Sequence, residues 1–215
     1  MNPLGQRESA AIPKLNASLI WKKEPRYDSF ITAAGGAGVA SIPFFSIGKG
    51  VPGSGFAIKT EAETNLSAGG KIGGENQFLL YGFTVSVLPN VLAALAASTL
   101  ASDTALIYNP AVFRFSLGGN IQLEVPLVKI PTGVGPTGFA TNYTAGTPLH
   151  ESCITNGVPH ISQYYNFTVP GSKLPLLLFG SQTFRCEIVY PLANLVTLTI
   201  TRIRCYMHGV FGQTK

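Results

Sequence analysis

Charge is the property in shortest supply in this sequence. Of 215 residues, 12% are Asp, Glu, Lys or Arg and 46% are apolar, whereas typical globular domains carry about 25% charged residues. A surface with so few charges indicates that much of it faces other protein. The ten carboxylates are scattered along the chain, so no pair of them can be nominated as a general acid and base.

Cysteine and long apolar runs are scarce as well. The three cysteines, Cys153, Cys186 and Cys205, are odd in number and lack metal-ligand spacing, which favours free, buried thiols and folding in a reducing cytosol. The longest aliphatic run, Val91 to Ala101, is far shorter than the ~20 residues that cross a bilayer. The first residues lack the apolar core of a signal peptide. We therefore expect no integral membrane segment.

Motifs that mark catalytic or metal sites are incomplete. Residues 150–153 (HESC) group three metal-ligand types on a Gly- and Pro-rich stretch, but no second cluster completes a tetrahedral site. Ser54 has Gly directly on either side, whereas a nucleophile elbow needs glycines two positions away. Lys49 and Lys71 are not followed by the Ser or Thr of a P-loop. We predict no enzyme activity and no cofactor, which disfavours a hydrolase on a β scaffold.

What the chain does contain is strand sequence, and its longest stretch is Leu195–Phe211. Val196, Leu198 and Ile200 alternate with threonines, which predicts that these three side chains face the core. The alternation then inverts, so we expect a bulge or a sharp twist near Thr201. A strand of this length needs a neighbour on each side and should lie centrally in a sheet.

Other strands are predicted where β-branched and aromatic runs lie between Gly- and Pro-rich turns. They cover residues 41–47, 56–60, 77–88, 104–108, 111–117, 121–130, 163–169, 173–179 and 183–190, with a hairpin turn at 118–120. Asn90 is a suitable N-cap for one helix over Val91–Leu100, and residues 131–160 predict a long loop. A series of strands with one helix, and with no alternation of strands and helices, indicates an antiparallel sandwich or barrel.

Residues 1–40 show no sustained periodicity and carry five of the fifteen basic residues. We interpret them as an N-terminal arm ahead of one β domain over residues 41–215; a first strand paired with that domain is the alternative. An arm should be removable without unfolding the domain, although assembly would suffer. Basic side chains on an arm are suited to weak contact with nucleic acid. The candidate contacts are Lys14, Lys22, Lys23 and Arg26.

A series of turn and strand motifs runs through residues 41–212. It comprises FFSIG (44–48), ETNL (63–66), NQF (76–78), YGFTV (81–85), NGVP (156–159), FRCE (184–187) and GVFG (209–212). In this order the motifs resemble those of jelly-roll capsid proteins from small tailless bacteriophages and related environmental viruses. Because the motifs are turn and strand patterns, the resemblance concerns the architecture of the chain more than its chemistry.

The resemblance implies an all-β fold: a single viral jelly roll, which is an antiparallel eight-stranded β-sandwich, with one short helix and an N-terminal arm. Its last strand would lie between the first strand and a later one. The implied function is that of a structural virion protein, a self-assembling subunit of the icosahedral shell around the viral genome. Such a protein folds in the host cytoplasm and resides in the virion.

The implied partners are copies of the chain itself in trimers or larger assemblies, other virion proteins, and genomic nucleic acid touched weakly by the arm. The main shell subunit and a minor vertex or spike-base protein both fit. We expect the loop over residues 131–160 and the helix over 91–100 at subunit contacts, with Leu95 and Phe139 as candidate residues.

A lectin-like receptor-binding module, or a spike or fibre module, on a β-sandwich is the alternative function. Aromatic side chains exposed at loop tips would favour the lectin-like module. A flat side wall with apolar patches would favour the shell subunit.

Overall fold

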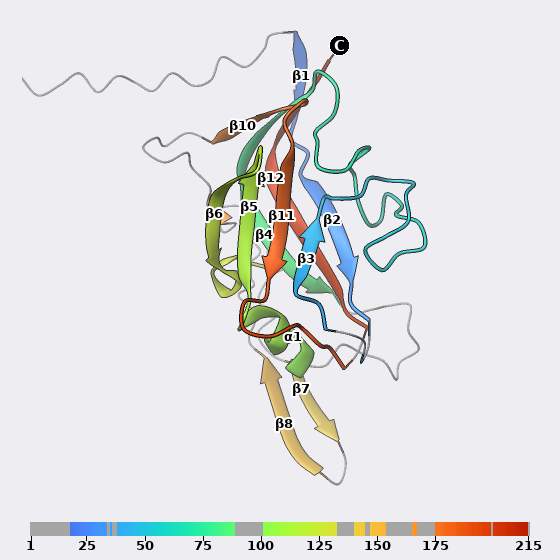
Figure 1. Cartoon of the computed structure of the whole chain (residues 1–215), viewed down its shortest axis with the longest axis vertical. Helices are drawn as coiled ribbons and strands as arrows, with labels where there is room; N and C mark the ends of the chain where they lie inside the picture. Colours follow the sequence, from blue (N-terminus) through green and yellow to red (C-terminus); the bar gives the residue numbers. More distant parts are fainter. Residues whose placement is uncertain are drawn as a thin grey trace, which may run out of the picture.

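The computed structural model describes residues 18–33, 35, 38–88, 101–132, 140–144, 147–153, 165–166, 175–198 and 200–214. These residues form two antiparallel sheets that face each other, one short α-helix and a separate two-stranded hairpin (Figure 1). The prediction of an all-β sandwich built from antiparallel sheets is confirmed at this level.

The first sheet is organised around its last strand in the sequence. It contains β1 (Leu19–Lys22), β2 (Arg26–Ile31), β4 (Gln77–Leu88), β9 (Tyr165–Asn166), β10 (Leu176–Phe179) and β12 (Arg202–Thr214). β12 pairs with β4 along one side and with β1 and β2 along the other, while β9 and β10 pair with the far side of β4. The C-terminal strand is therefore central, as predicted. Its register shift lies between His208 and Gly209 rather than near Thr201.

The second sheet has the strand order β3-β11-β5-β6. Its strands are β3 (Ser41–Phe44), β5 (Val112–Leu117), β6 (Asn120–Pro126) and β11 (Phe184–Val189), and a short 3-10 helix, η1 (Leu127–Lys129), follows β6. Gly118 and Gly119 join β5 to β6 with φ of 58° and 85°, the left-handed conformations that a tight hairpin turn requires. The predicted hairpin is confirmed.

Apolar side chains from both sheets fill the space between them. The Phe83 ring, from β4, lies 5.0 Å from the Phe113 ring and 5.2 Å from the Phe115 ring, both from β5. These tilted contacts are the arrangement that aromatic rings prefer. Cys186 and Cys205 are buried in the same core as free thiols, as predicted. The side chain of Cys153 lies outside the described residues.

The segment ahead of β12 differs from its prediction. Val196, Leu198 and Ile200 were expected in the core, but all three are exposed. The strand begins only at Arg202, and alternate side chains from Ile203 onward face the core instead. The prediction of a buried apolar face over residues 196–200 is therefore wrong.

Three local predictions are also corrected. Residues 104–108 were expected as a strand but belong to α1 (Ala101–Tyr108). The buried side chains of Ile107 and Tyr108 are compatible with either element, so their apolar character did not distinguish a helix from a strand. Residues 56–60 form no strand. The expected loop over 131–160 contains the hairpin of β7 (Ala140–Thr144) and β8 (Thr147–Cys153). The helix expected at 91–100 lies outside the described residues.

Residues 18–33, part of the expected arm, belong to the sandwich. β1 and β2 run antiparallel to β12 and pair with it from Leu19 to Ile31. Of the two interpretations of residues 1–40, a first strand paired with the body describes this part of the chain. Residues 1–17 lie outside the described residues.

A buried ion pair fastens the long connection between β3 and β4. Lys59 Nζ lies 2.7 Å from Asp28 Oδ1, and both side chains are completely buried. The backbone N–H of Phe45 donates to Asp28 Oδ2 over 2.6 Å. Burial raises the pKa of Asp28, an effect that the Lys59 ammonium and the Phe45 N–H oppose. The ion pair thus links the connection to β2. In the described residues β2 is at an edge of the first sheet and β3 is at an edge of the second.

The central strand also gives the fold a predicted acid sensitivity through His208. Its Nε2 is hydrogen-bonded to Thr84 Oγ1 at 2.9 Å, and burial lowers its pKa to about 4 from the ordinary 6.5. The folded state therefore binds a proton less readily than the unfolded state, so stability is complete above pH 6.5 and is lost as the pH falls toward 4. The loss is on the order of 2–3 kcal/mol.

We expect His208→Gln to flatten this dependence. The measurement is the free energy of unfolding in urea at pH 7 and at pH 4.5 for parent and variant. The same loss of stability in both proteins would contradict the assignment to His208.

Candidate interaction surface

Ahead of β12 the chain presents a line of apolar side chains to solvent. Val196, Leu198 and Ile200 are 45%, 66% and 41% exposed. We call these three side chains the apolar ridge. Large apolar side chains exposed one beside another, rather than singly, are characteristic of surfaces that another molecule covers.

Threonines occupy the buried side of the same segment. Thr197 Oγ1 donates to Thr32 Oγ1 over 3.0 Å, and the Thr201 N–H donates to the same oxygen over 3.1 Å. All three threonines are buried. Turning the segment over would expose Thr197 and leave the Thr32 hydroxyl facing apolar side chains without these two hydrogen bonds. The hydrogen bonds of Thr197 and Thr201 to Thr32 therefore keep the apolar ridge exposed.

Two neighbouring elements hold the ridge in place. Val39 and Leu195 exchange backbone hydrogen bonds of 2.9 Å in both directions. On the other side, Asp103 Oδ1, on α1, accepts a 2.8 Å hydrogen bond from the Leu198 N–H. Leu106, one turn further along α1, is also exposed. The ridge is consequently a fixed surface rather than a loose chain, and it needs little ordering when a partner binds.

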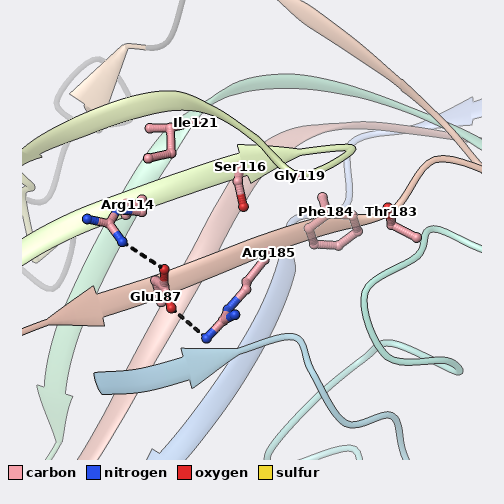
Figure 2. A pocket seen from close by; sticks show the side chains of 8 residues that line it. All are labelled: Arg114, Ser116, Gly119, Ile121, Thr183, Phe184, Arg185 and Glu187. Carbon is pink, nitrogen blue, oxygen red and sulfur yellow. Dashed lines mark hydrogen bonds and ion pairs between the residues drawn. The ribbon is translucent and has the colours of Figure 1, made fainter. Parts of the chain in front are cut away.

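A second candidate is a shallow hollow of about 390 Å³ on the outer face of the second sheet (Figure 2). Arg114 Nη1 lies 3.4 Å from Glu187 Oε1, and Arg185 Nη2 lies 2.7 Å from Glu187 Oε2. Arg114 Nε is also 2.7 Å from Glu124 Oε2. The two arginines thus face two carboxylates, so the hollow has no surplus charge for an ionic ligand. Its one aromatic side chain, Phe184, is buried.

The basic residues that were predicted as nucleic-acid contacts differ in their exposure to solvent. Lys22 and Lys23 are exposed. Arg26 is only 6% exposed; its guanidinium lies 3.7 Å from the centre of the Phe211 ring and 2.9 Å from Glu24 Oε1. Arg26 is therefore engaged within the protein. Lys14 lies outside the described residues, as do the candidate subunit contacts Leu95 and Phe139.

The arginines at the start of β12 fasten the β3–β4 connection from its other side. The Arg202 guanidinium lies 5.5 Å from the centre of the Phe56 ring and 3.7 Å from Glu63 Oε1. Arg204 Nε donates to Ser29 Oγ over 2.8 Å, and its Nη2 donates to the carbonyl of Ala62. The side chains of Arg202 and Arg204 therefore link β12 to the β3–β4 connection and to β2.

The apolar ridge is a candidate interaction surface whose side chains the sequence predicted in the core. Its alternation of apolar residues with threonine was visible, but alternation defines two faces without saying which one is inside. The signal that could have helped is the arginine that follows at position 202, where the apolar phase of the strand changes.

Within the described ranges, no three His, Cys, Asp or Glu side chains are grouped as a metal ion would require. No helix in this part of the chain is long and apolar enough to cross a membrane. Comparisons with protein-family models, curated proteins and solved structures found no match. Function is therefore argued from the fold and its surfaces.

Proposed function

We propose that this chain is a self-assembling capsid subunit built as a single jelly roll, which forms the icosahedral shell around a viral genome. The observation that carries the proposal is the apolar ridge. Burying a Leu, Ile or Val side chain completely contributes about 1.5–3 kcal/mol, so covering three half-exposed ones contributes roughly 2–4 kcal/mol to association. A rigid apolar surface of this kind is suited to a protein that functions while packed against neighbouring subunits.

The strand order supports the jelly-roll part of the proposal. Along the chain, β2, β4, β9 with β10, and β12 enter the first sheet, while β3, β5, β6 and β11 enter the second. β12 returns to lie between β2 and β4, and β11 returns to lie between β3 and β5. Each sheet therefore has four strand positions, and in each sheet a late strand inserts between two earlier ones. This is the pattern of two Greek keys in a double-sheet jelly roll.

The position of the ridge supports the assembly part. The ridge contacts α1 through Asp103, and the β7–β8 hairpin projects from the sandwich beside α1 (Figure 1). A shell subunit contacts several neighbours, and this end of the molecule offers several elements to them. The low charge of the whole chain, 12%, agrees with a surface that is largely covered.

A lectin-like receptor-binding module is the second candidate, and Phe179 is the observation that favours it. This side chain is an exposed aromatic at the end of β10, before the turn into β11, where it could stack on a sugar ring. It is the one aromatic among the large exposed apolar side chains of the described residues. The hollow in Figure 2 adds no aromatic platform.

The experiment that separates the two candidates is the oligomeric state of the purified full-length chain. Light scattering coupled to size-exclusion chromatography should give a mass several times the 22.7 kDa of one subunit, with rings or particles in negative stain. A stable monomer at high micromolar concentration would contradict the capsid proposal and favour the lectin-like module.

The ridge itself is tested by Leu198→Asp. Because Leu198 is already exposed, the free energy of unfolding should change by less than about 0.5 kcal/mol. Assembly should weaken strongly, since a carboxylate would be buried without a partner at the contact. The matched control is Ile121→Asp, because Ile121 is 54% exposed on β6, away from the ridge. Parent-like assembly of Leu198→Asp would remove the ridge from the contact.

A further inference from the structure

Two buried thiols meet where the two sheets face each other. Cys186 lies on β11 of the second sheet and Cys205 on β12 of the first, and both are completely buried. Cys186 Sγ donates to Met207 Sδ over 4.0 Å, and Met207 follows Cys205 by two positions on the core face of β12. A hydrogen bond also joins the side chains of Cys186 and Cys205. The two thiols are therefore in contact across the space between the sheets.

Neighbouring strands hold the two cysteines at the same level of the sandwich. Cys186 is paired with Phe44 of β3, and Cys205 is paired with Asp28 of β2. The backbone N–H of Phe45, the residue after Phe44, donates to Asp28 Oδ2 over 2.6 Å. This hydrogen bond joins the two sheets one strand away from the thiols. It therefore limits how far Cys186 and Cys205 can move apart.

Burial keeps this pair in the thiol form. It raises the pKa of Cys186 well above its ordinary value, and the thiolate is the form that reacts in thiol–disulfide exchange. Neither side chain is exposed, so a reagent cannot reach the sulfurs while the sandwich is closed. Exchange therefore requires a local opening of the sandwich, or it takes place while the chain folds. In a reducing compartment the pair remains reduced.

We propose that Cys186 and Cys205 form a redox-sensitive pair, which becomes a disulfide between β11 and β12 when the chain meets a low-molecular-weight disulfide such as oxidised glutathione. This inference goes beyond the proposed function and does not depend on it.

The reaction is an exchange in two steps. One protein thiol loses its proton and attacks the oxidant, which gives a mixed disulfide and releases one glutathione. The second protein thiol loses its proton and attacks the protein sulfur of the mixed disulfide, which forms the protein disulfide and releases the second glutathione. The two protein thiols are oxidised, the glutathione disulfide is reduced to two thiols, and the two protons go to the glutathione sulfurs.

The place of the pair in the sheets indicates what the bond would do. β11 lies between β3 and β5, and β12 lies between β2 and β4. A disulfide here joins an interior strand of one sheet to an interior strand of the other and closes a loop over residues 186–205. A closed loop reduces the conformational freedom of the unfolded chain. The oxidised chain should therefore unfold at a higher urea concentration than the reduced chain.

Refolding in a glutathione redox buffer tests the pair. The full chain with Cys153→Ser, which removes the third thiol, is unfolded in urea with a reductant and refolded in buffers of increasing oxidised fraction. Free thiols are then alkylated, and the intact mass and the cysteine peptides are measured. We expect both remaining thiols to be lost to alkylation, a mass lower by two hydrogen atoms, and linked peptides that contain Cys186 and Cys205. Refolding in oxidising buffer should also raise the urea midpoint.

The matched control is the same chain with Cys205→Ala added, whose urea midpoint should not depend on the redox buffer. Refolding admits the oxidant before the core closes, so failure to react cannot be attributed to burial. The proposal is overturned if both thiols stay free in the most oxidising buffer, or if each carries its own glutathione. A linked chain that unfolds at a lower urea concentration than the reduced one also overturns it. Any of these results leaves the proposed self-assembly untouched, because they concern the chain by itself.

Discussion

Removal of residues 1–33 is expected to abolish the cooperative unfolding transition. These residues supply β1 and β2, which pair with β12 from Leu19 to Ile31. Without them β12 has an unpaired edge, and Lys59 keeps a buried ammonium with no carboxylate beside it. An uncompensated buried charge alone costs about 3–5 kcal/mol, a large part of the 5–15 kcal/mol that stabilises a typical domain. Urea unfolding followed by circular dichroism measures the effect.

The matched control is a chain that begins at Ser18, which retains both strands. It should unfold cooperatively, with a midpoint near that of the full chain. If the chain that lacks residues 1–33 keeps the same midpoint, these residues are a removable arm, as the sequence first suggested, and their place in the sheet is not needed for folding.

Replacement of Lys59 by Met is expected to lower the free energy of unfolding by about 3–5 kcal/mol. Methionine fits a similar volume, so the loss arises mainly from the Asp28 carboxylate, which stays buried without its cation. Burial raises the pKa of Asp28, so protonation favours the folded state and ionisation opposes it as the pH rises through the folded pKa. The deficit of the variant should therefore shrink as the pH is lowered.

Lys49→Met is the matched control for this ion pair. Lys49 Nζ also lies 2.7 Å from a carboxylate, that of Glu61, but both side chains are exposed, and exposed pairs contribute little. Its unfolding should match that of the parent. A double change of Asp28→Leu with Lys59→Met should recover most of the loss, because no charge is left in the core. Equal effects of the two lysine variants would show that burial does not decide the outcome.

Local patterns in the sequence predicted those elements whose signals lie within a few residues. β4 begins and ends at the predicted residues, Gln77 and Leu88, because an alternating run there is bounded by a polar stretch and a proline. The β5–β6 turn followed from two adjacent glycines that accept positive φ. The central position of β12 followed from its length.

Features that depend on distant partners could not be predicted in this way. Thr197 lies inside and Leu198 outside because Thr32, far away in the sequence, supplies the hydrogen bonds. Lys59 would be placed at the surface by its charge, yet Asp28 holds it in the core. α1 resembled a strand because Ile107 and Tyr108 are apolar residues that fit either element, and burial against the sandwich decided between them.

The central position of β12 determines when the first sheet can form during synthesis of the chain. β12 is translated after every other strand of the sandwich, yet β2 and β4 meet only through it; the contact between Ser29 and Arg204 spans 175 positions. Such distant pairings fold slowly, and the first sheet cannot close on a ribosome that still holds β12. The apolar ridge, which leads directly into β12, is ordered at the same late moment. Any contact that depends on the folded sandwich must therefore form after β12 has been synthesised.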